Sequence, residues 1–245
     1  MRELGGEQVE GRRAVRELLV AGRRRVRDVW MAEGAGDDEI VALAAGARVP
    51  VRRVSRARLD AEAGTDAPQG VLAHAEGLPE AELAALCEGR RPFLLVVDGV
   101  TDPHNLGALL RTAEIGGATG AVLPRHRAAH VTPAVTKAAA GAIEYLPIAV
   151  VAGIPSALSG LAAKGVWTIG LDPGGRQSVH DLDLATEPVA LVVGAEGEGM
   201  SRLSKARCDV LVAVPQHGRL PSLNVAAAAA VAVFEIARRR AAAAQ

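Results

Sequence analysis

From residue 93 onward, short apolar runs without polar alternation are separated by stretches whose apolar residues have helical spacing. Such runs are typical of strands buried on both faces, and the helices between them supply the crossovers that parallel strands need. We therefore expect an α/β fold with a mostly parallel sheet covered on both faces. The expected strands are 94–97, 121–123, 147–151, 166–171, 189–193 and 210–214, and the expected helices are 106–115, 133–140, 154–164, 200–206 and a long last helix from about 223.

The first part of the chain predicts a separate, small α/β domain. Its expected elements are helices at 12–21 and 37–47, strands at 26–31 and 49–54, a third helix capped by Ser55, and an extended segment at 69–73. The acidic, Ala-rich stretch 76–91, with Pro79 and Pro92 at its ends, is typical of a linker that holds a short helix. We predict an N-terminal domain at 1–75 and a second domain at 92–245.

Loops that leave the strands of the second domain are where a ligand site is expected, because parallel α/β sheets bind ligands beyond the carboxyl ends of their strands. The first such loop, DGVTDPHNLGALLR, contains Asn105 and Arg111. Their separation places Asn105 at a helix entry and Arg111 almost two turns later, on roughly one face. Taken alone, the pair also fits a helix cap at Asn105 and a surface ion pair at Arg111.

The second loop, LVVGAEGEGM, contains glycines at 194, 197 and 199 that let backbone approach a ligand closely. Its spacing is GxxGxG rather than the GxGxxG of dinucleotide-binding loops, and it comes late in the domain. No acidic residue ends a second strand at the expected distance downstream. The pattern therefore argues against an NAD site.

The third loop, VPQHGRLPSLNV, opens the last helix. Ser222 is well placed to cap that helix, whereas Asn224 would lie in its first turn, where Asn is a mediocre helix former. A functional role therefore explains Asn224 better than helix formation does. The chain has no GxSxG or HExxH motif and no histidine with a partner at metal spacing, so neither a hydrolase nor a metal site is indicated.

Basic residues concentrate at the front of a chain whose net charge is zero. Residues 1–58 carry 13 Arg against 9 Asp or Glu, and Arg23, Arg24 and Arg25 are adjacent. This density suits contact with nucleic-acid phosphates, and a solvated helix face is the alternative. Because the whole chain has only 2 Trp, 1 Tyr and 2 Phe, a base-stacking sheet of the RRM kind is not expected.

The cysteine content and the lengths of the apolar runs limit the kind of protein that this chain can be. Cys87 and Cys208 form no CxxC motif, which favours two reduced, partly buried thiols. No apolar run reaches the roughly 18 residues that span a bilayer, and the start MRELGGEQVEGRR lacks the apolar core of a secretory signal. We expect a cytoplasmic protein with no membrane partner.

Taken together and in this order, DPHNLGALLRTAE, LVVGAEGEGMS and VPQHGRLPSLNVAAAAAVAVFE closely resemble the three signature motifs of the SpoU (TrmH) family of RNA ribose 2'-O-methyltransferases. The front end, with GRRAVRELL and QGVLA, resembles the RNA-binding domain of the subgroup that modifies a guanosine in large-subunit (23S) rRNA. The resemblance implies an L30e-like N-terminal domain and a SPOUT methyltransferase domain with a C-terminal trefoil knot. Such a knot is an exception to the rule that chains do not thread loops.

The resemblance also implies roles for particular residues. Family positions for catalysis and RNA binding fall on Asn105, Arg111, Glu196, Ser222 and Asn224, and backbone around Gly194, Val214 and Leu223 would hold S-adenosyl-L-methionine. A homodimer is implied as well. Two departures stand out: Pro68 replaces a His common in relatives, and Ala226–Ala230 fills a stretch where Ser or Thr is common.

The chemistry of the implied reaction limits the role of Arg111. Methyl transfer from a sulfonium to a ribose hydroxyl is an in-line displacement, so alignment of the reactants supplies much of the rate. An Arg side chain has a pKa above about 12, so Arg111 is a poor general base. Its guanidinium suits gripping the adjacent phosphate and stabilising alkoxide charge, with that phosphate or water accepting the proton.

Three other activities remain as alternatives. The same reaction could act on tRNA, but tRNA-acting members more often use short terminal extensions than a separate front domain. A non-catalytic ribosome-assembly RNA binder would not need all five catalytic-type residues together. A drug-resistance methyltransferase of the same family, acting on an adenosine, is the third.

Overall fold

A computed structural model describes residues 4–65, 68–220 and 222–244. The chain forms two compact units, and one segment of sequence from the second half belongs to the first unit. Unit 1 comprises the chain up to Glu80 together with His130–Tyr145, and unit 2 comprises Ala81–Ala129 and the chain from Leu146 onward. The first change of unit lies inside the predicted linker 76–91, while the assignment of functional domains to 1–75 and 92–245 stays a prediction.

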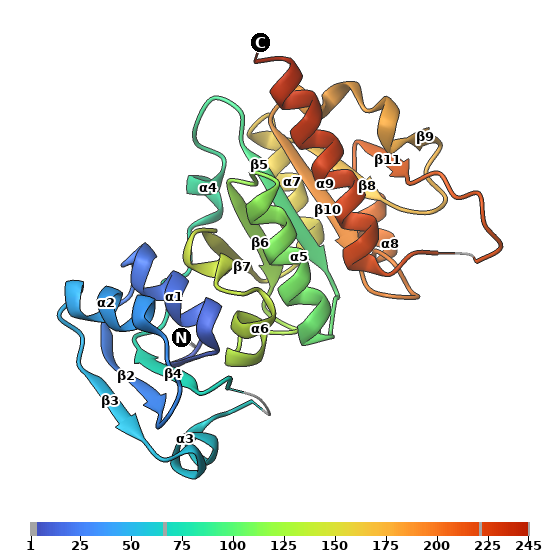
Figure 1. The fold of residues 1–245 in the computed structure, drawn as a ribbon. Helices are drawn as coiled ribbons and strands as arrows, with labels where there is room; N and C mark the ends of the chain where they lie inside the picture. The colour runs from blue at the N-terminus through green and yellow to red at the C-terminus, as the bar shows by residue number, and fades with distance from the viewer. Residues whose placement is uncertain (1–3, 66–67, 221, 245) are drawn as a thin grey trace. The chain divides into compact units, whose positions relative to one another are not determined.

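Unit 2 is built on a seven-stranded sheet in which every pair of neighbouring strands is parallel (Figure 1). The strand order is β7-β6-β5-β10-β8-β11-β9. This arrangement confirms the predicted parallel α/β architecture. The strands are β5 (Phe93–Asp98), β6 (Gly120–Pro124), β7 (Ile148–Val151), β8 (Trp167–Leu171), β9 (Gln177–Ser178), β10 (Val189–Gly194) and β11 (Val210–Ala213).

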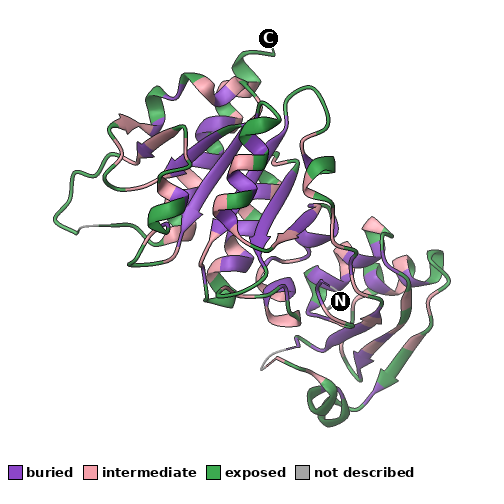
Figure 2. Cartoon of the chain, turned by 180° about the vertical axis from the view of Figure 1, so that it is seen from behind, coloured by how far each residue is buried: buried purple, intermediate pink, exposed green. Residues whose placement is uncertain are grey.

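Helices cover both faces of this sheet, which is why its strands are apolar throughout (Figures 1 and 2). On one face, Leu94 and Val192 pack with Leu158 of α7. On the other face, α5 and α9 lie side by side, and a Cβ added at Gly116, which ends α5, would lie 2.1 Å from Cγ1 of Val233. The helices are α4 (Leu83–Leu86), α5 (Pro103–Ile115), α7 (Ile154–Ala163), α8 (Arg202–Lys205) and α9 (Val225–Ala242).

Unit 1 has a four-stranded sheet of order β1-β4-β2-β3, in which β2 and β3 are parallel and the other pairs are antiparallel. Side chains alternate across β2, so Val29 and Met31 pack under α1 and α2, while Trp30 and Ala32 face α3. The elements are β1 (Gln8–Glu10), α1 (Arg12–Ala21), β2 (Val26–Ala32), α2 (Asp38–Gly46), β3 (Val51–Val54), α3 (Arg56–Glu62) and β4 (Val71–Ala75).

The segment His130–Tyr145, which contains α6 (Pro133–Ala138) and the short 3-10 helix η1 (Ala142–Glu144), is tied to unit 1 by side chains. Arg24 and Glu144 form an ion pair in which both side chains are fully buried. Tyr145 donates its hydroxyl hydrogen to Glu17 over 2.7 Å. These contacts explain why a segment that lies between β6 and β7 in sequence belongs to unit 1.

Each helix and strand expected from the sequence has a counterpart, with ends shifted by a few residues. The sequence missed β1 and β9, which are three and two residues long and too short to show a period. The last helix begins at Val225 rather than near Leu223. No described helix combines the length and apolar character that crossing a membrane requires.

Candidate active site

Three side chains from the three predicted loops form one hydrogen-bonded network. Asn105 Nδ2 donates to Glu196 Oε2 over 3.0 Å. Asn224 Nδ2 donates to Asn105 Oδ1 over 3.0 Å and to Glu196 Oε1 over 3.3 Å. Segments separated by up to 119 positions in sequence therefore meet at the carboxyl ends of β5 and β10.

Local signals in the first loop place Asn105 at this meeting point. Asp102 precedes α5 and caps it, accepting from the backbone N–H of His104 over 3.0 Å. Pro103 follows at the first helical position, where its missing N–H costs nothing. Asn105 therefore lies in the first turn of α5 with its side chain free for Glu196, and the alternative that Asn105 is the helix cap is wrong.

The second loop reaches the network because glycines let it fold back on itself. A Cβ added at Gly194 would lie 2.0 Å from the backbone nitrogen of Met200, so any other residue there would push the loop away. Gly197 and Gly199 have φ of +81° and +70°, in the left-handed region that favours glycine. Asp98, at the end of β5, then accepts from the backbone N–H of Ser201 over 2.8 Å and anchors the end of the loop.

Asn224, and not Ser222, caps the last helix. Asn224 Oδ1 accepts from the backbone N–H groups of Ala226 and Ala227 over 2.9 and 3.4 Å. The prediction that Ser222 is the cap was wrong because α9 starts two residues later than its apolar pattern suggests. One side chain thus caps the start of α9 and also donates hydrogen bonds to Asn105 and Glu196.

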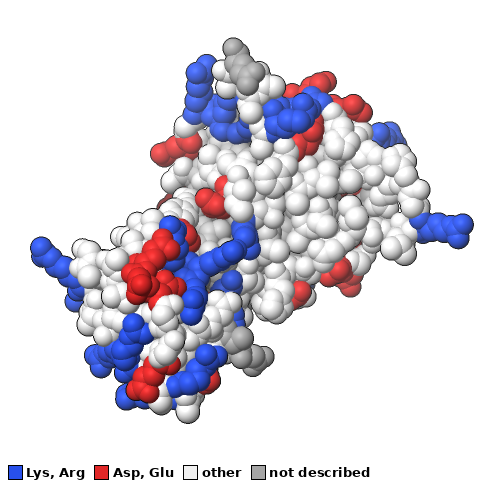
Figure 3. Space-filling view, viewed as in Figure 1, with Lys and Arg blue, Asp and Glu red and all other residues white. Residues whose placement is uncertain are grey.

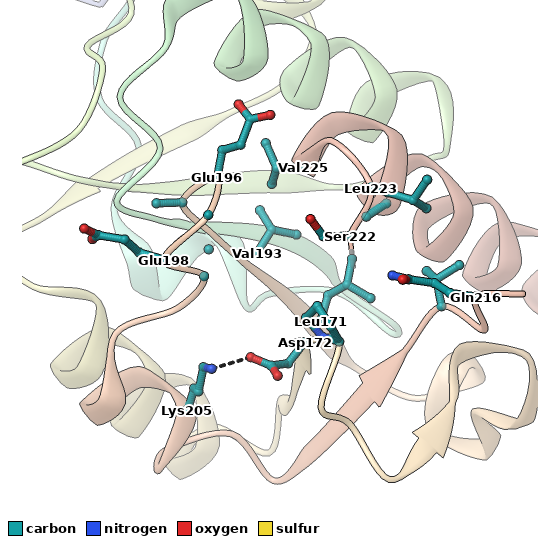
Figure 4. Close-up of a pocket in the computed structure, with 17 residues that line it drawn as sticks. Leu171, Asp172, Val193, Glu196, Glu198, Lys205, Gln216, Ser222, Leu223 and Val225 are labelled. Atoms are coloured by element: carbon teal, nitrogen blue, oxygen red, sulfur yellow. Dashed lines mark ion pairs between the residues drawn. The ribbon is translucent and has the colours of Figure 1, made fainter. Parts of the chain in front are cut away.

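A cavity of about 260 Å³ lies beside this network (Figure 4). The backbone of the second loop, the start of α9 and the ends of β8, β10 and β11 enclose it. Four of its apolar side chains are Leu171, Val193, Val214 and Leu223. The three residues predicted to hold a cofactor (Gly194, Val214 and Leu223) all line the cavity, as do Glu196 and Ser222.

Three charged residues that were not predicted from the sequence also line the cavity: Asp172, Glu198 and Lys205. Lys205 Nζ lies 2.5 Å from Asp172 Oδ2 (Figure 4). Partial burial opposes ionisation of Asp172, but hydrogen bonds from Lys205 and the backbone of Gly174 outweigh it and lower the pKa of this carboxyl. The sequence did contain one signal for Asp172, which is its position directly after strand β8. Asp98 has a similar position at the end of β5.

Arg111 stands apart from the network. It lies in the second half of α5, is exposed, and has no hydrogen bond or ion pair with any residue that the structure describes. Its guanidinium donors are therefore available to a ligand. The sequence prediction grouped it with Asn105 on one face, whereas the structure links only Asn105 to Glu196 and Asn224.

The three adjacent arginines of the front end have different surroundings. Arg24 is buried against Glu144 and also donates to the backbone oxygen of Gly6, so its charge cannot reach an RNA phosphate. Arg23 donates to the backbone oxygen of Glu144 over 2.9 Å. Arg25 keeps an 81% exposed side chain, 3.8 Å from Glu76. Of the three predicted RNA contacts, Arg24 is thus excluded by burial.

Within residues 4–65, 68–220 and 222–244, no group of three or more His, Cys, Asp or Glu side chains could hold a metal ion. Cys87 and Cys208 are free and half-buried, as predicted. Burial and neighbouring carboxylates raise the pKa of Cys208 to about 12, so this thiol is a poor nucleophile at neutral pH.

Comparison with known proteins agrees with this arrangement. The SpoU rRNA methylase family matches residues 92–234, and the RNA 2'-O ribose methyltransferase substrate-binding domain matches residues 8–81. The chain is 40% identical to the 23S rRNA (guanosine-2'-O-)-methyltransferase RlmB of Pseudomonas putida over 96% of this chain and 97% of that protein. It is 38% identical to RlmB of Haemophilus influenzae over 96% and 98%.

Solved structures have the same fold over both units. The SpoU methyltransferase AviRb from Streptomyces viridochromogenes superposes with a TM-score of 0.83 at 24% identity, covering 98% of this chain and 91% of that one. An AdoMet-bound rRNA methyltransferase from Sinorhizobium meliloti superposes with a TM-score of 0.77 at 25% identity, covering 97% and 88%. The converging motifs and these matches establish that the chain belongs to the SpoU rRNA methylase family.

Proposed function

We propose that this chain transfers a methyl group from S-adenosylmethionine to the ribose 2'-hydroxyl of a guanosine in 23S rRNA. The observation that carries the proposal is the Asn105–Glu196–Asn224 network beside a cavity, in a chain 40% identical to RlmB over nearly its whole length. The front unit would then bind the RNA, as the name of its matching domain suggests.

The chemical character of the cavity lining suits S-adenosylmethionine. Leu171, Val193 and Leu223 offer apolar surface to an adenine ring and a methylene chain, and the loop backbone near Gly194 offers hydrogen-bonding groups. Glu196 and Glu198 also line the cavity, and their negative charge favours a cationic ligand. When bound, the cofactor supplies a methyl group on a positively charged sulfur.

The chain's own residues would position the RNA and stabilise charge. The network holds the Asn105 amide, the Glu196 carboxylate and the Asn224 amide in one geometry next to the cavity. Orientation of this kind supplies much of the rate in a displacement that forms and breaks bonds in line. The guanidinium of Arg111, which has no partner among the described residues, would bind the phosphate beside the target ribose and stabilise the developing alkoxide, and that phosphate or water would take the proton.

Methylation mapping tests this function directly. rRNA from a strain that lacks this protein is incubated with purified enzyme and S-adenosylmethionine, and 2'-O-methylated positions are mapped by their resistance to alkaline cleavage. We expect one new 2'-O-methylguanosine in 23S rRNA, with none in a tRNA pool treated in the same way. Modification of tRNA only, of an adenosine, or of no RNA would contradict the proposed substrate.

Calorimetry tests the cofactor separately. S-adenosylmethionine should give a binding heat and raise the melting temperature, because a ligand that binds only the folded state stabilises it. NADH, which the loop spacing does not fit, should give neither effect. Binding of NADH alone would show that the cavity has been assigned to the wrong cofactor.

We also propose that the protein is a homodimer of the cytoplasm. Ile115 at the end of α5 and Phe234 on α9 are 59% and 49% exposed, and their chain neighbours Gly116 and Val233 are in contact. An apolar face of this kind suits cover by a second copy of the chain. Light scattering at micromolar concentration should give twice the chain mass, whereas a fully active monomer would refute the dimer. The trefoil knot stays a prediction from the family resemblance.

A further inference from the structure

Unit 1 has a basic surface that the reaction site in unit 2 does not use. The sequence from 48 to 58 contains five arginines and no acidic residue. It forms β3, which is an edge strand of the sheet, and the start of α3. In Figure 3, blue side chains gather over β3 and α3. The arginines are Arg48, Arg52, Arg53, Arg56 and Arg58.

Arg58 lies over an aromatic ring on this surface. Its guanidinium carbon is 5.0 Å from the centroid of the Trp30 ring. The ring is itself held in place, because Trp30 Nε1 donates to Asp28 Oδ2 over 3.3 Å and the His74 ring meets it edge-on at 5.2 Å. His74 Nδ1 in turn lies 2.6 Å from Asp28 Oδ1. The ring under Arg58 therefore has a defined orientation.

Among the described residues, the Arg58 guanidinium has no polar partner, unlike the guanidinium groups of Arg52, Arg53 and Arg56. Arg52 pairs with Asp28, Arg56 pairs with Asp60, and Arg53 donates to the backbone oxygen of Ala35. The Arg58 guanidinium has no hydrogen bond or ion pair with any described residue, and the side chain is exposed. The guanidinium thus lies over the Trp30 ring, and its N–H donors, which make no bond to a described residue, are available to a ligand.

We propose that Arg58, supported by Trp30, is a stacking platform for one unpaired base of the RNA substrate. An Arg guanidinium plane stacks on bases, and single-stranded RNA is recognised by such stacking because its bases can be splayed out. The neighbouring arginines supply charge for the flanking phosphates. The scarcity of aromatics argues against a stacking sheet of the RRM kind, but a platform for a single base needs only one ring and one arginine. This inference rests on the proposed function, which makes RNA the substrate.

Fluorescence of Trp30 tests the platform. The full-length Trp167→Phe variant keeps Trp30 as its single tryptophan. It is titrated with an unstructured oligoribonucleotide of about 12 nucleotides, which is within the usual site size of single-strand binders. We expect the RNA to change the fluorescence of Trp30, and a duplex of the same sequence to bind more weakly and change it less. No change with the single strand, or an equal response to the duplex, would overturn the proposal.

Two substitutions in the same background separate stacking from charge. Arg58→Lys keeps the charge and loses the plane, so affinity should fall by about 5-fold to 100-fold, the usual effect of one lost stacking contact. Its salt dependence should stay near that of the parent protein. Arg58→Ala should lose similar affinity and also flatten the salt slope by about 0.7, as expected for one charge on a single strand. Arg90→Ala, which removes an exposed arginine of unit 2, is the matched control and should bind like the parent.

The outcomes also separate this inference from the proposed function. Arg58→Lys binding with parental affinity, in an enzyme that methylates 23S rRNA, would overturn the stacking platform alone. An enzyme that transfers no methyl group to any RNA would refute the proposed function, whatever Arg58 does. Because Arg58 is exposed and has no ion pair with a described residue, its variants should melt within about a degree or two of the parent, in keeping with surface substitutions.

Discussion

Asn224 Nδ2 lies 3.0 Å from Asn105 Oδ1, so the residue that caps α9 also contacts the first turn of α5. The same amide donates to Glu196, while the Asn224 oxygen accepts from the backbone N–H groups of Ala226 and Ala227 in the first turn of α9. The start of the last helix and the geometry of the candidate site are therefore set by one side chain.

Substitutions of Asn224 should separate these two roles. Asn224→Ala removes the cap and the two network bonds that Asn224 donates, so stability should fall by about 1 kcal/mol together with turnover. Asn224→Ser keeps a capping hydroxyl but cannot reach both partners as a donor, so its stability should be near the parent value while turnover falls. Urea unfolding and single-turnover methylation measure the two effects. A serine variant with parental turnover would show that the network plays no part in catalysis.

Replacing Arg111 should affect chemistry without affecting the fold. The side chain has no partner among the described residues, so Arg111→Ala should keep the melting temperature and cofactor binding. Turnover should fall by at least about 100-fold, as happens when one donor to a developing oxyanion is lost. Arg90→Ala, before β5 at the opposite end of the parallel sheet, is the control and should stay active. Full activity of Arg111→Ala would remove this residue from the catalytic set.

Arg24 and Arg25 should behave oppositely despite being neighbours. Arg24→Ala leaves the Glu144 carboxylate buried without its cation, which typically costs about 3–5 kcal/mol. Arg24→Met combined with Glu144→Leu should recover much of that loss. Arg25→Ala should stay within about 0.5 kcal/mol of the parent, as exposed substitutions do. Equal stability of the two single alanine variants would contradict the buried pair.

The RNA role of the front arginines is then best tested with Arg23 and Arg25 alone. If their side chains meet phosphates, the double alanine variant should bind RNA more weakly and flatten the salt slope by up to about two units, with nearly unchanged single-turnover chemistry on saturating RNA. Parental salt dependence would show that these arginines only solvate the surface. Arg24 is left unchanged because its substitution should destabilise the fold, and unfolding would also lower the measured RNA affinity.

Glu235 on α9 should make stability depend on acid pH. A hydrogen bond from Arg238, opposed by burial and aided by Arg239, lowers the pKa of Glu235 from its ordinary 4.5 to about 2. A lowered pKa in the folded state stabilises the fold above the ordinary value, and this stabilisation is lost as pH falls through the folded pKa. Glu235→Gln should therefore be less stable than the parent at pH 7, and the difference should shrink between about pH 5 and pH 2. Glu114→Gln on α5 is the control, and an equal pH profile for both variants would contradict this reading.

Local signals in the sequence determined the architecture of unit 2 and the identity of its site. Apolar runs of strand length, separated by amphipathic helices, permit only a parallel sheet covered on both faces. The carboxyl ends of such strands share one edge of the sheet, so three loops read separately from the sequence had to meet there. Asn105, Glu196 and Asn224 were predicted on that basis together with the family motifs, and they lie within hydrogen-bonding distance of one another.

Tertiary structure decided what depends on partners far away in sequence. Nothing in the sequence distinguishes Arg24 from its neighbours Arg23 and Arg25. Only Arg24 is buried, because it forms an ion pair with Glu144, which lies 120 positions later in sequence. Asn224 caps α9 and also donates to Asn105 and Glu196, which lie 119 and 28 positions earlier in sequence. The cation–π contact between Arg58 and Trp30 likewise arises only when α3 folds over β2. Burial and pairing are properties of a packed chain, so local pattern alone could not predict them.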